Sequence, residues 1–145
     1  MIHKGGFTLI EILVVVVLLG ILAVIVVPYI SGAGVESRTT ALATDLRRVR
    51  SQLELYKFHH NDQLPAATGE NPADFLRRMT TQTDANGDPG VDFGPYLQSL
   101  PVNPFNDLAT VRIDGAAAGA NSDGWRFDTI TGAFQADDSP GHAAF

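Results

Sequence analysis

The chain contains no cysteine among its 145 residues, so no disulfide can hold its fold together. Positive charge is also scarce, because ten Lys and Arg stand against sixteen Asp and Glu and give a formal net charge of −6 at pH 7. A protein that neutralises phosphates needs surplus Lys and Arg, so this balance argues against a nucleic-acid partner. The one basic cluster, Arg47, Arg48 and Arg50, has acidic neighbours and is interpreted as a solvated helix face.

Catalytic motifs are missing as well. The sequence has no Gly-x-Ser-x-Gly elbow, no phosphate-binding loop and no paired-histidine metal motif. His59 and His60 are adjacent and would point apart on a helix, which favours surface histidines over a metal site. We therefore expect no enzyme. A membrane-anchored enzyme and a DNA-uptake subunit are the weaker alternatives.

The apolar residues are concentrated near the N-terminus, in the string MIHKGGFTLIEILVVVVLLGILAVIVVPYI. As a helix, residues 7–30 would be about 36 Å long, enough to cross a bilayer core of about 30 Å. His3 and Lys4 precede this segment, so its short N-terminal end is expected in the cytoplasm. A cleaved secretory signal would usually have a shorter apolar core. Pro28 and the length of the run argue against a nucleotide-binding strand.

Glu11 is the one acidic residue inside this apolar segment. A carboxylate in lipid costs roughly 3 kcal/mol on insertion scales. A single span has no partner helix of its own, so Glu11 must find a counter-charge at the helix end or on another molecule. Gly20 and Pro28 are the weak points of the same helix, because Gly has a poor helix propensity and Pro removes a backbone hydrogen bond. Pro28 predicts a kink.

A helical periodicity continues beyond the apolar segment. Apolar residues at alternating three- and four-residue steps form one stripe, in which Thr39 fills the place between the first two: Val35, Leu42, Leu46, Val49, Leu53 and Tyr56. The stripe is either the seam of a coiled-coil dimer or the face of a long helix that a small head covers. We favour the head, because the rest of the chain needs a surface to pack on. The whole helix would extend from about Thr8 to His59.

The C-terminal part is rich in Gly, Pro, Asn and Asp. Asn71 and Pro72 predict the start of a short helix that extends to about Met79. Alternating apolar residues predict three strands, at 109–114, 125–128 and 133–136. Gly132 lies in the short connection between the last two strands and predicts that they form a hairpin.

The connections complete the expected fold. Residues 115–123 are interpreted as a flexible connection and residues 137–145 as a tail. The predicted fold class is α+β: a long N-terminal helix, then a small head with a short helix, an irregular loop and a small antiparallel β-sheet.

One loop has the spacing of a cation site. Its oxygen donors occupy the first, third, fifth and ninth positions, as Asp84, Asn86, Asp88 and Asp92. Ca²⁺ takes six to eight oxygen ligands from flexible loops, which makes these residues candidate ligands. However, Pro89 stands where an EF-type loop has its turn Gly, and Pro95 stands where it has its bidentate Glu. The segment is thus a calcium site or, as we favour, an ordinary turn in a solvated loop.

The string KGGFTLIEILVVVVLLGILAVIVVP resembles the type III signal of the type IV pilin superfamily, which includes the pseudopilins of type II secretion. The resemblance implies a leader, residues 1–6, that a prepilin peptidase removes after Gly6, and N-methylation of the new terminal residue, Phe7. Glu11 then becomes the fifth residue of the mature chain, where the family has a Glu. Gly20 and Pro28 also match family positions, and the family fold agrees with the one predicted above.

The head resembles the family less specifically. The strings GPYLQSLPVNPFND and GWRFDTITGAFQAD are similar to major pseudopilins. Many pilus-forming pilins staple their C-terminal region with a disulfide, whereas major pseudopilins hold Ca²⁺ in a C-terminal loop. The lack of Cys favours a pseudopilin, but no residue-by-residue match to that calcium loop is found. Ca²⁺ is thus the one candidate cofactor, and its site is left open.

The resemblance implies a structural subunit of a type II secretion pseudopilus or related filament; a type IV pilus pilin for adhesion, motility or DNA uptake is the alternative. Its parts would be the leader (1–6), an inner-membrane and filament-core helix (7–30) and a periplasmic or extracellular head (31–145). The implied partners are further copies of the chain, other pilins or pseudopilins, the prepilin peptidase and methyltransferase, and an inner-membrane assembly platform with its ATPase. In the filament, Glu11 of one subunit would pair with the Phe7 amine of a neighbour and fix axial register.

Overall fold

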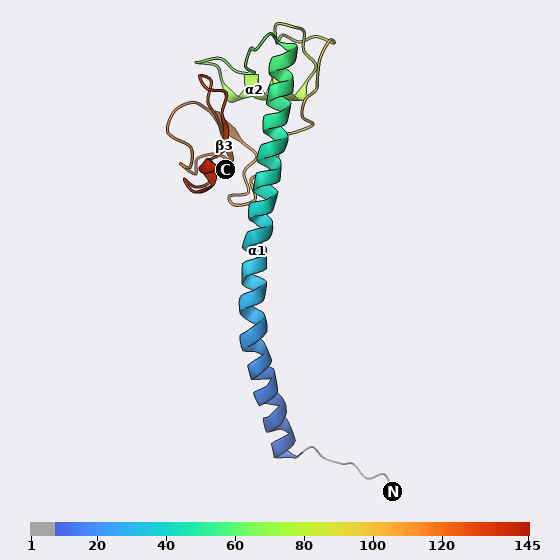
Figure 1. Cartoon of the computed structure of the whole chain (residues 1–145), viewed down its shortest axis with the longest axis vertical. Coiled ribbons are helices and arrows are strands. Elements are labelled where there is room, and N and C mark those ends of the chain that lie inside the picture. The colour runs from blue at the N-terminus through green and yellow to red at the C-terminus, as the bar shows by residue number, and fades with distance from the viewer. Residues whose placement is uncertain (1–7) are drawn as a thin grey trace. The chain divides into compact units, whose positions relative to one another are not determined.

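The computed structural model describes residues 8–145, except that the side chains of residues 25–33 are left out of the description. The elements follow in the order α1 (Leu9–His59), α2 (Pro72–Thr80), β1 (Val111–Ile113), β2 (Trp125–Phe127), β3 (Phe134–Ala136) and the 3-10 helix η1 (His142–Ala144) (Figure 1). The chain divides into two compact units, Met1–Ser37 and Arg38–Phe145. We call the second unit the head.

The N-terminal unit contains the first half of α1. The helix is continuous through both Gly20 and Pro28. Among the residues that the structure describes, no helix combines the length and apolar character needed to cross a membrane. Residue 7 and the side chains of residues 25–30, which belong to the expected span 7–30, lie outside the described residues.

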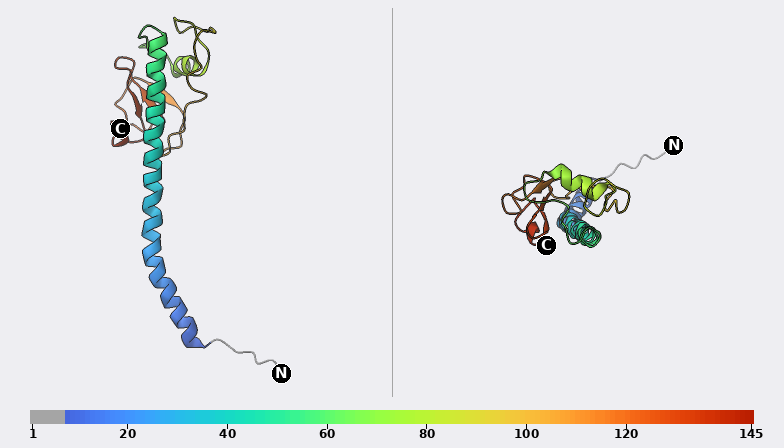
Figure 2. Two further views of the ribbon diagram at one scale, coloured as in Figure 1. Left: turned by 45° about the vertical axis from the view of Figure 1, so that its right-hand side comes forward. Right: turned by 90° about the horizontal axis from the view of Figure 1, so that it is seen from above.

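The head is built on the C-terminal part of α1. Its other elements lie beside this part of the helix in Figure 1 and in both views of Figure 2. The stripe residues that face them are all buried: Leu42, Leu46, Val49, Leu53 and Tyr56. This burial confirms that a head covers the stripe. Val35 is the exception, since it lies in the N-terminal unit and is 60% exposed.

The short helix α2 begins as predicted. Asn71 is its N-cap, and Asn71 Oδ1 accepts hydrogen bonds from the N–H groups of Ala73 at 2.8 Å and Asp74 at 3.2 Å. Pro72 occupies the first turn, where its missing N–H costs nothing. One face of α2 then buries Phe75 and Met79 in the core of the head.

The three predicted strands form one sheet in the order β1-β2-β3, but the sheet is mixed and not wholly antiparallel. β2 and β3 are antiparallel, with Phe127 opposite Phe134, and confirm the predicted hairpin. β1 runs parallel to β2, with Val111 opposite Trp125, so the antiparallel prediction was wrong for this pair. The reason is the long connection, residues 114–124, which returns the chain to the end where β1 began.

Candidate functional site

The start of α1 is closed by a capping box. Thr8 donates to Glu11 Oε2 from both its backbone N–H and its hydroxyl, each at 2.8 Å, and the N–H of Glu11 donates to Thr8 Oγ1 at 3.3 Å. This arrangement satisfies donors that a helix N-terminus leaves unpaired. The Thr-x-x-Glu spacing of residues 8–11 is the sequence signature of such a box. The carboxylate therefore has partners within its own chain.

Glu11 lies on a helix surface that is otherwise apolar. From Leu9 to Val24, every large apolar side chain of α1 is more than half exposed. A contiguous apolar surface of this kind marks contact with a membrane or with other proteins. The core of the head is formed by residues 42–136 alone, so it does not use this surface. Gly6 and Phe7, the predicted cleavage residues, lie outside the described residues.

The predicted calcium loop is folded as a turn around Asp84. Its Oδ1 atom accepts hydrogen bonds from the N–H groups of Asn86 at 2.8 Å and Asp88 at 3.0 Å. These hydrogen bonds lower the pKa of the Asp84 carboxyl below its ordinary value. Val91 and Asp92 are exposed. The structure thus places one of the four candidate ligands in contact with the backbone of two others.

The two adjacent histidines have separate partners. The Nδ1 atom of His59 lies 2.9 Å from the hydroxyl of Tyr96. His60 is buried, with Nδ1 2.7 Å from the carbonyl oxygen of Tyr56 and Nε2 3.0 Å from the hydroxyl of Thr83. Both rings pack against Phe93, with ring centroids 4.6 Å away for His59 and 5.6 Å away for His60, so the expectation that they point apart was wrong. The prediction of a surface position was also wrong for His60. Its burial depends on the loop that returns over the end of α1, which the local sequence does not reveal.

The fully buried side chain of Asp137 organises the connection between β1 and β2. Its carboxylate faces the guanidinium of Arg112, with Nε–Oδ2 and Nη2–Oδ1 distances of 3.0 and 2.7 Å. It also accepts hydrogen bonds from the backbone N–H groups of Gly119, Ala120 and Asp123 and from the hydroxyl of Ser122. Burial alone would raise the pKa of this carboxyl, but the hydrogen bonds from Arg112 and the loop hold it well below its ordinary value.

The C-terminal residues are also held by hydrogen bonds and an ion pair, so they do not form the predicted tail. The buried Asn103 donates from Nδ2 to the carbonyl oxygen of Gly124 and to Asp138 Oδ1, each at 2.9 Å. Asp138 pairs in turn with His142, at the start of η1. Arg50 of α1 donates from Nε to the carbonyl oxygen of Phe134 at 3.0 Å. Arg50 also donates from Nη2 to the carbonyl oxygen of Phe145 at 2.6 Å, which connects the C-terminal end to α1.

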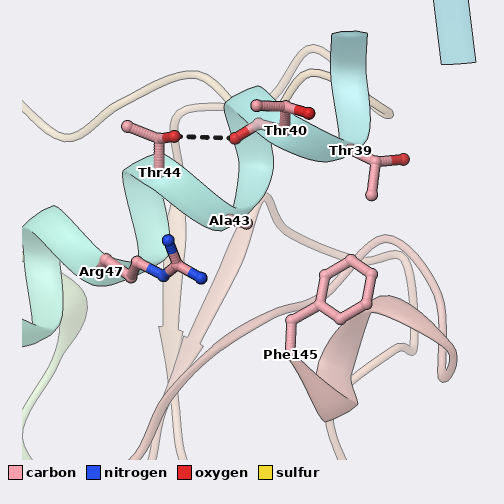
Figure 3. Close-up of a pocket in the computed structure, with 6 residues that line it drawn as sticks. All are labelled: Thr39, Thr40, Ala43, Thr44, Arg47 and Phe145. Carbon is pink, nitrogen blue, oxygen red and sulfur yellow. Dashed lines mark hydrogen bonds between the residues drawn. The ribbon is translucent and has the colours of Figure 1, made fainter. Parts of the chain in front are cut away.

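A surface groove of about 320 Å³ lies where the C-terminal end approaches α1 (Figure 3). Its lining consists of Thr39, Thr40, Ala43, Thr44, Arg47 and Phe145. Thr44 donates its hydroxyl to the carbonyl oxygen of Thr40 at 2.8 Å, and Arg47 supplies the one charged side chain of the lining. General acid–base chemistry needs a group that titrates near the working pH. This groove offers a guanidinium and hydroxyls, a set suited to contact and not to proton transfer.

Comparison with known proteins identifies the N-terminal segment and the head together. Residues 1–27 match the family model described as the prokaryotic N-terminal methylation motif. The chain is similar to the type II secretion system core protein G of Pseudomonas aeruginosa, with 30% identity over 136 residues, covering 83% of this chain and 92% of that protein.

Two further relatives carry the same name. The Dickeya chrysanthemi protein is 33% identical over 103 residues, covering 71% of this chain and 64% of that protein. The Escherichia coli K12 protein is 39% identical over 114 residues, covering 74% of this chain and 72% of that protein. No solved structure gives a significant match. The similarity to these relatives extends over most of the chain and shows that it belongs to the family of the type II secretion system core protein G.

Proposed function

We propose that this pseudopilin is the repeating, non-enzymatic subunit of a type II secretion pseudopilus. The observation that carries the proposal is that the two parts of α1 have different surfaces. Its C-terminal part supplies the stripe that the head buries, whereas the surface from Leu9 to Val24 is apolar and exposed. That second surface needs cover from lipid before assembly and from the helices of other copies after it.

The N-terminal segment suggests the order in which the subunit is inserted, processed and assembled. Residues 7–30 would anchor the precursor in the inner membrane with the head in the periplasm. The prepilin peptidase would remove residues 1–6 and methylate Phe7, and an assembly platform with its ATPase would then draw the subunit into the filament. The match of residues 1–27 to the N-terminal methylation motif supports this sequence of events.

Glu11 would guide docking within the apolar core of the filament. Packing of Val, Leu and Ile side chains specifies axial position poorly, whereas one buried polar pair can fix register. The partner would be the terminal amine of Phe7 on a neighbouring subunit, which is largely protonated at neutral pH. Gly20 and Pro28 would allow α1 to unwind locally where neighbouring helices pack.

Processing tests this proposal directly. Replacing Gly6 by Leu should block removal of residues 1–6, because a bulky side chain would fill the place of Gly at the cleavage site. Filament yield should then fall to background. Gly6→Ala, the smallest change at the same position, is the control and should still be trimmed. Intact-mass measurement of assembled subunits should show a chain that starts at Phe7 and carries one added methyl group. Filaments built from chains that start at Met1 would contradict the proposal.

A further inference from the structure

The loop between β1 and β2, residues 114–123, surrounds a positive charge that belongs to the chain itself. Arg112 donates from Nη1 to the carbonyl oxygens of Asp114 and Ala116, each at 2.7 Å. It donates from Nη2 to the carbonyl oxygen of Ala117 at 2.9 Å. With the two hydrogen bonds to Asp137, every nitrogen of the guanidinium has an oxygen partner. One side chain thus holds three carbonyls of the loop and one buried carboxylate.

These oxygens are the kind that a hard cation takes. Ca²⁺ in proteins is bound by carboxylates and backbone carbonyls drawn from one flexible loop. Here a carboxylate and three carbonyls converge on one positive centre, but that centre is the guanidinium of Arg112. Within the part of the chain that the structure describes, no group of three or more His, Cys, Asp or Glu side chains could hold a metal ion. The oxygen donors of this loop therefore already accept hydrogen bonds from Arg112. The Ca²⁺ ion that the family resemblance implies does not fit among them.

We propose that Arg112 is the resident cation of this head: its guanidinium takes the place of a bound Ca²⁺ between the loop carbonyls and Asp137. The charge balance supports the substitution, because a buried carboxylate is stable only when a counter-charge and hydrogen bonds satisfy it. Arg112 supplies both from a fixed position in a strand, so the loop needs no ion from solution. The stability of the head is consequently independent of calcium.

The parent protein tests the claim without any substitution. The full-length chain in detergent micelles should melt at the same temperature in millimolar calcium chloride and in excess chelator. Trp125 is the only Trp of the chain and is fully buried in β2, so its fluorescence reports unfolding of the head. An ion that bound the folded head would raise the melting temperature by mass action. A calcium-dependent rise of more than about 2 °C in the parent would overturn the proposal.

Arg112→Ala tests the identity of the cation. Removing the guanidinium leaves Asp137 without its counter-charge, so the melting temperature should fall by about 5 °C or more. Calcium should now raise it, because the freed oxygens can accept an ion. The matched control is Arg126→Ala. Arg126 lies opposite Arg112 in the neighbouring strand and pairs with Asp128 at 2.9 Å, but it donates to none of the three loop carbonyls.

The control should show no response to calcium, whatever its melting temperature. Should Arg112→Ala fail to fold, Arg112→Gln replaces it, since Gln removes the charge but keeps an amide donor and part of the side-chain volume. A smaller fall in melting temperature with a rise in calcium is then expected. A parental melting temperature in the Arg112 variant, or a variant that calcium leaves unchanged, would refute the assignment of Arg112 as the loop's cation.

Discussion

Replacing Leu46 by Ala should lower the free energy of unfolding of the head by about 2–5 kcal/mol. Leu46 is 1% exposed and lies in the middle of the buried stripe of α1. Truncation would leave a cavity between the helix and the elements that cover it, and close packing allows only partial collapse. Domains of this size are stable by only about 5–15 kcal/mol, so the loss would be a large fraction of the total.

Leu55→Ala is the matched control. It makes the same chemical change in the same helix, but Leu55 is 42% exposed on the side away from the core. Its effect should stay within about 0.5 kcal/mol. Both variants can be followed by denaturant unfolding with the fluorescence of Trp125. If Leu46→Ala left head unfolding unchanged and instead dissociated a dimer, the stripe would be a coiled-coil seam and not the foundation of the head.

The sequence was informative wherever structure depends on neighbours along the chain. The three- and four-residue steps from Leu42 to Tyr56 predicted a buried helix face, and burial confirms it. Asn71 followed by Pro72 predicted the start of α2, because capping involves residues only two or three positions apart. The alternation around Gly132 predicted the β2–β3 hairpin for the same reason.

Features that depend on distant partners were not predictable in this way. Arg112 and Asp137 are 25 positions apart, and no local pattern connects them. The segment between β1 and β2 has the composition of a flexible connection. Its backbone nevertheless contacts both members of this ion pair, because the carbonyl oxygen of Ala116 accepts from Arg112 and the N–H of Gly119 donates to Asp137. The parallel pairing of β1 depends on the path of the same segment. Burial of His60 likewise requires the loop around Thr83 to fold back over α1.

Glu11→Val should reduce filament yield at least about tenfold while leaving the head intact. The span becomes more apolar, so membrane insertion should be unharmed or improved. The core of the head uses none of the residues around Glu11, so its melting temperature should not change. Loss of a close charge pair in an interface costs about 1.5 kcal/mol or more, which corresponds to about a tenfold loss in binding. The measurement is filament yield per unit of trimmed, membrane-inserted subunit.

The capping box gives Glu11 a second role that this variant would remove at the same time. Glu11→Val deletes the acceptor for the N–H and hydroxyl of Thr8, so fraying of α1 could itself slow assembly. Two milder variants separate the roles. Glu11→Gln keeps an acceptor for the capping box but loses the charge. Thr8→Ala keeps the charge but loses the capping hydroxyl, at a cost of about 1 kcal/mol in helix stability.

If Glu11 guides docking by its charge, Glu11→Gln should assemble poorly and Thr8→Ala should assemble nearly as well as the parent. The opposite ranking would show that Glu11 serves its own helix, and that register is set elsewhere. Mixed filaments sharpen the comparison, because an incoming Glu11→Gln subunit should be accepted poorly by parental neighbours even when it is correctly trimmed. A Glu11→Gln subunit that enters mixed filaments at the parental rate would exclude pairing with a neighbouring Phe7 amine, since an amide offers that amine no counter-charge.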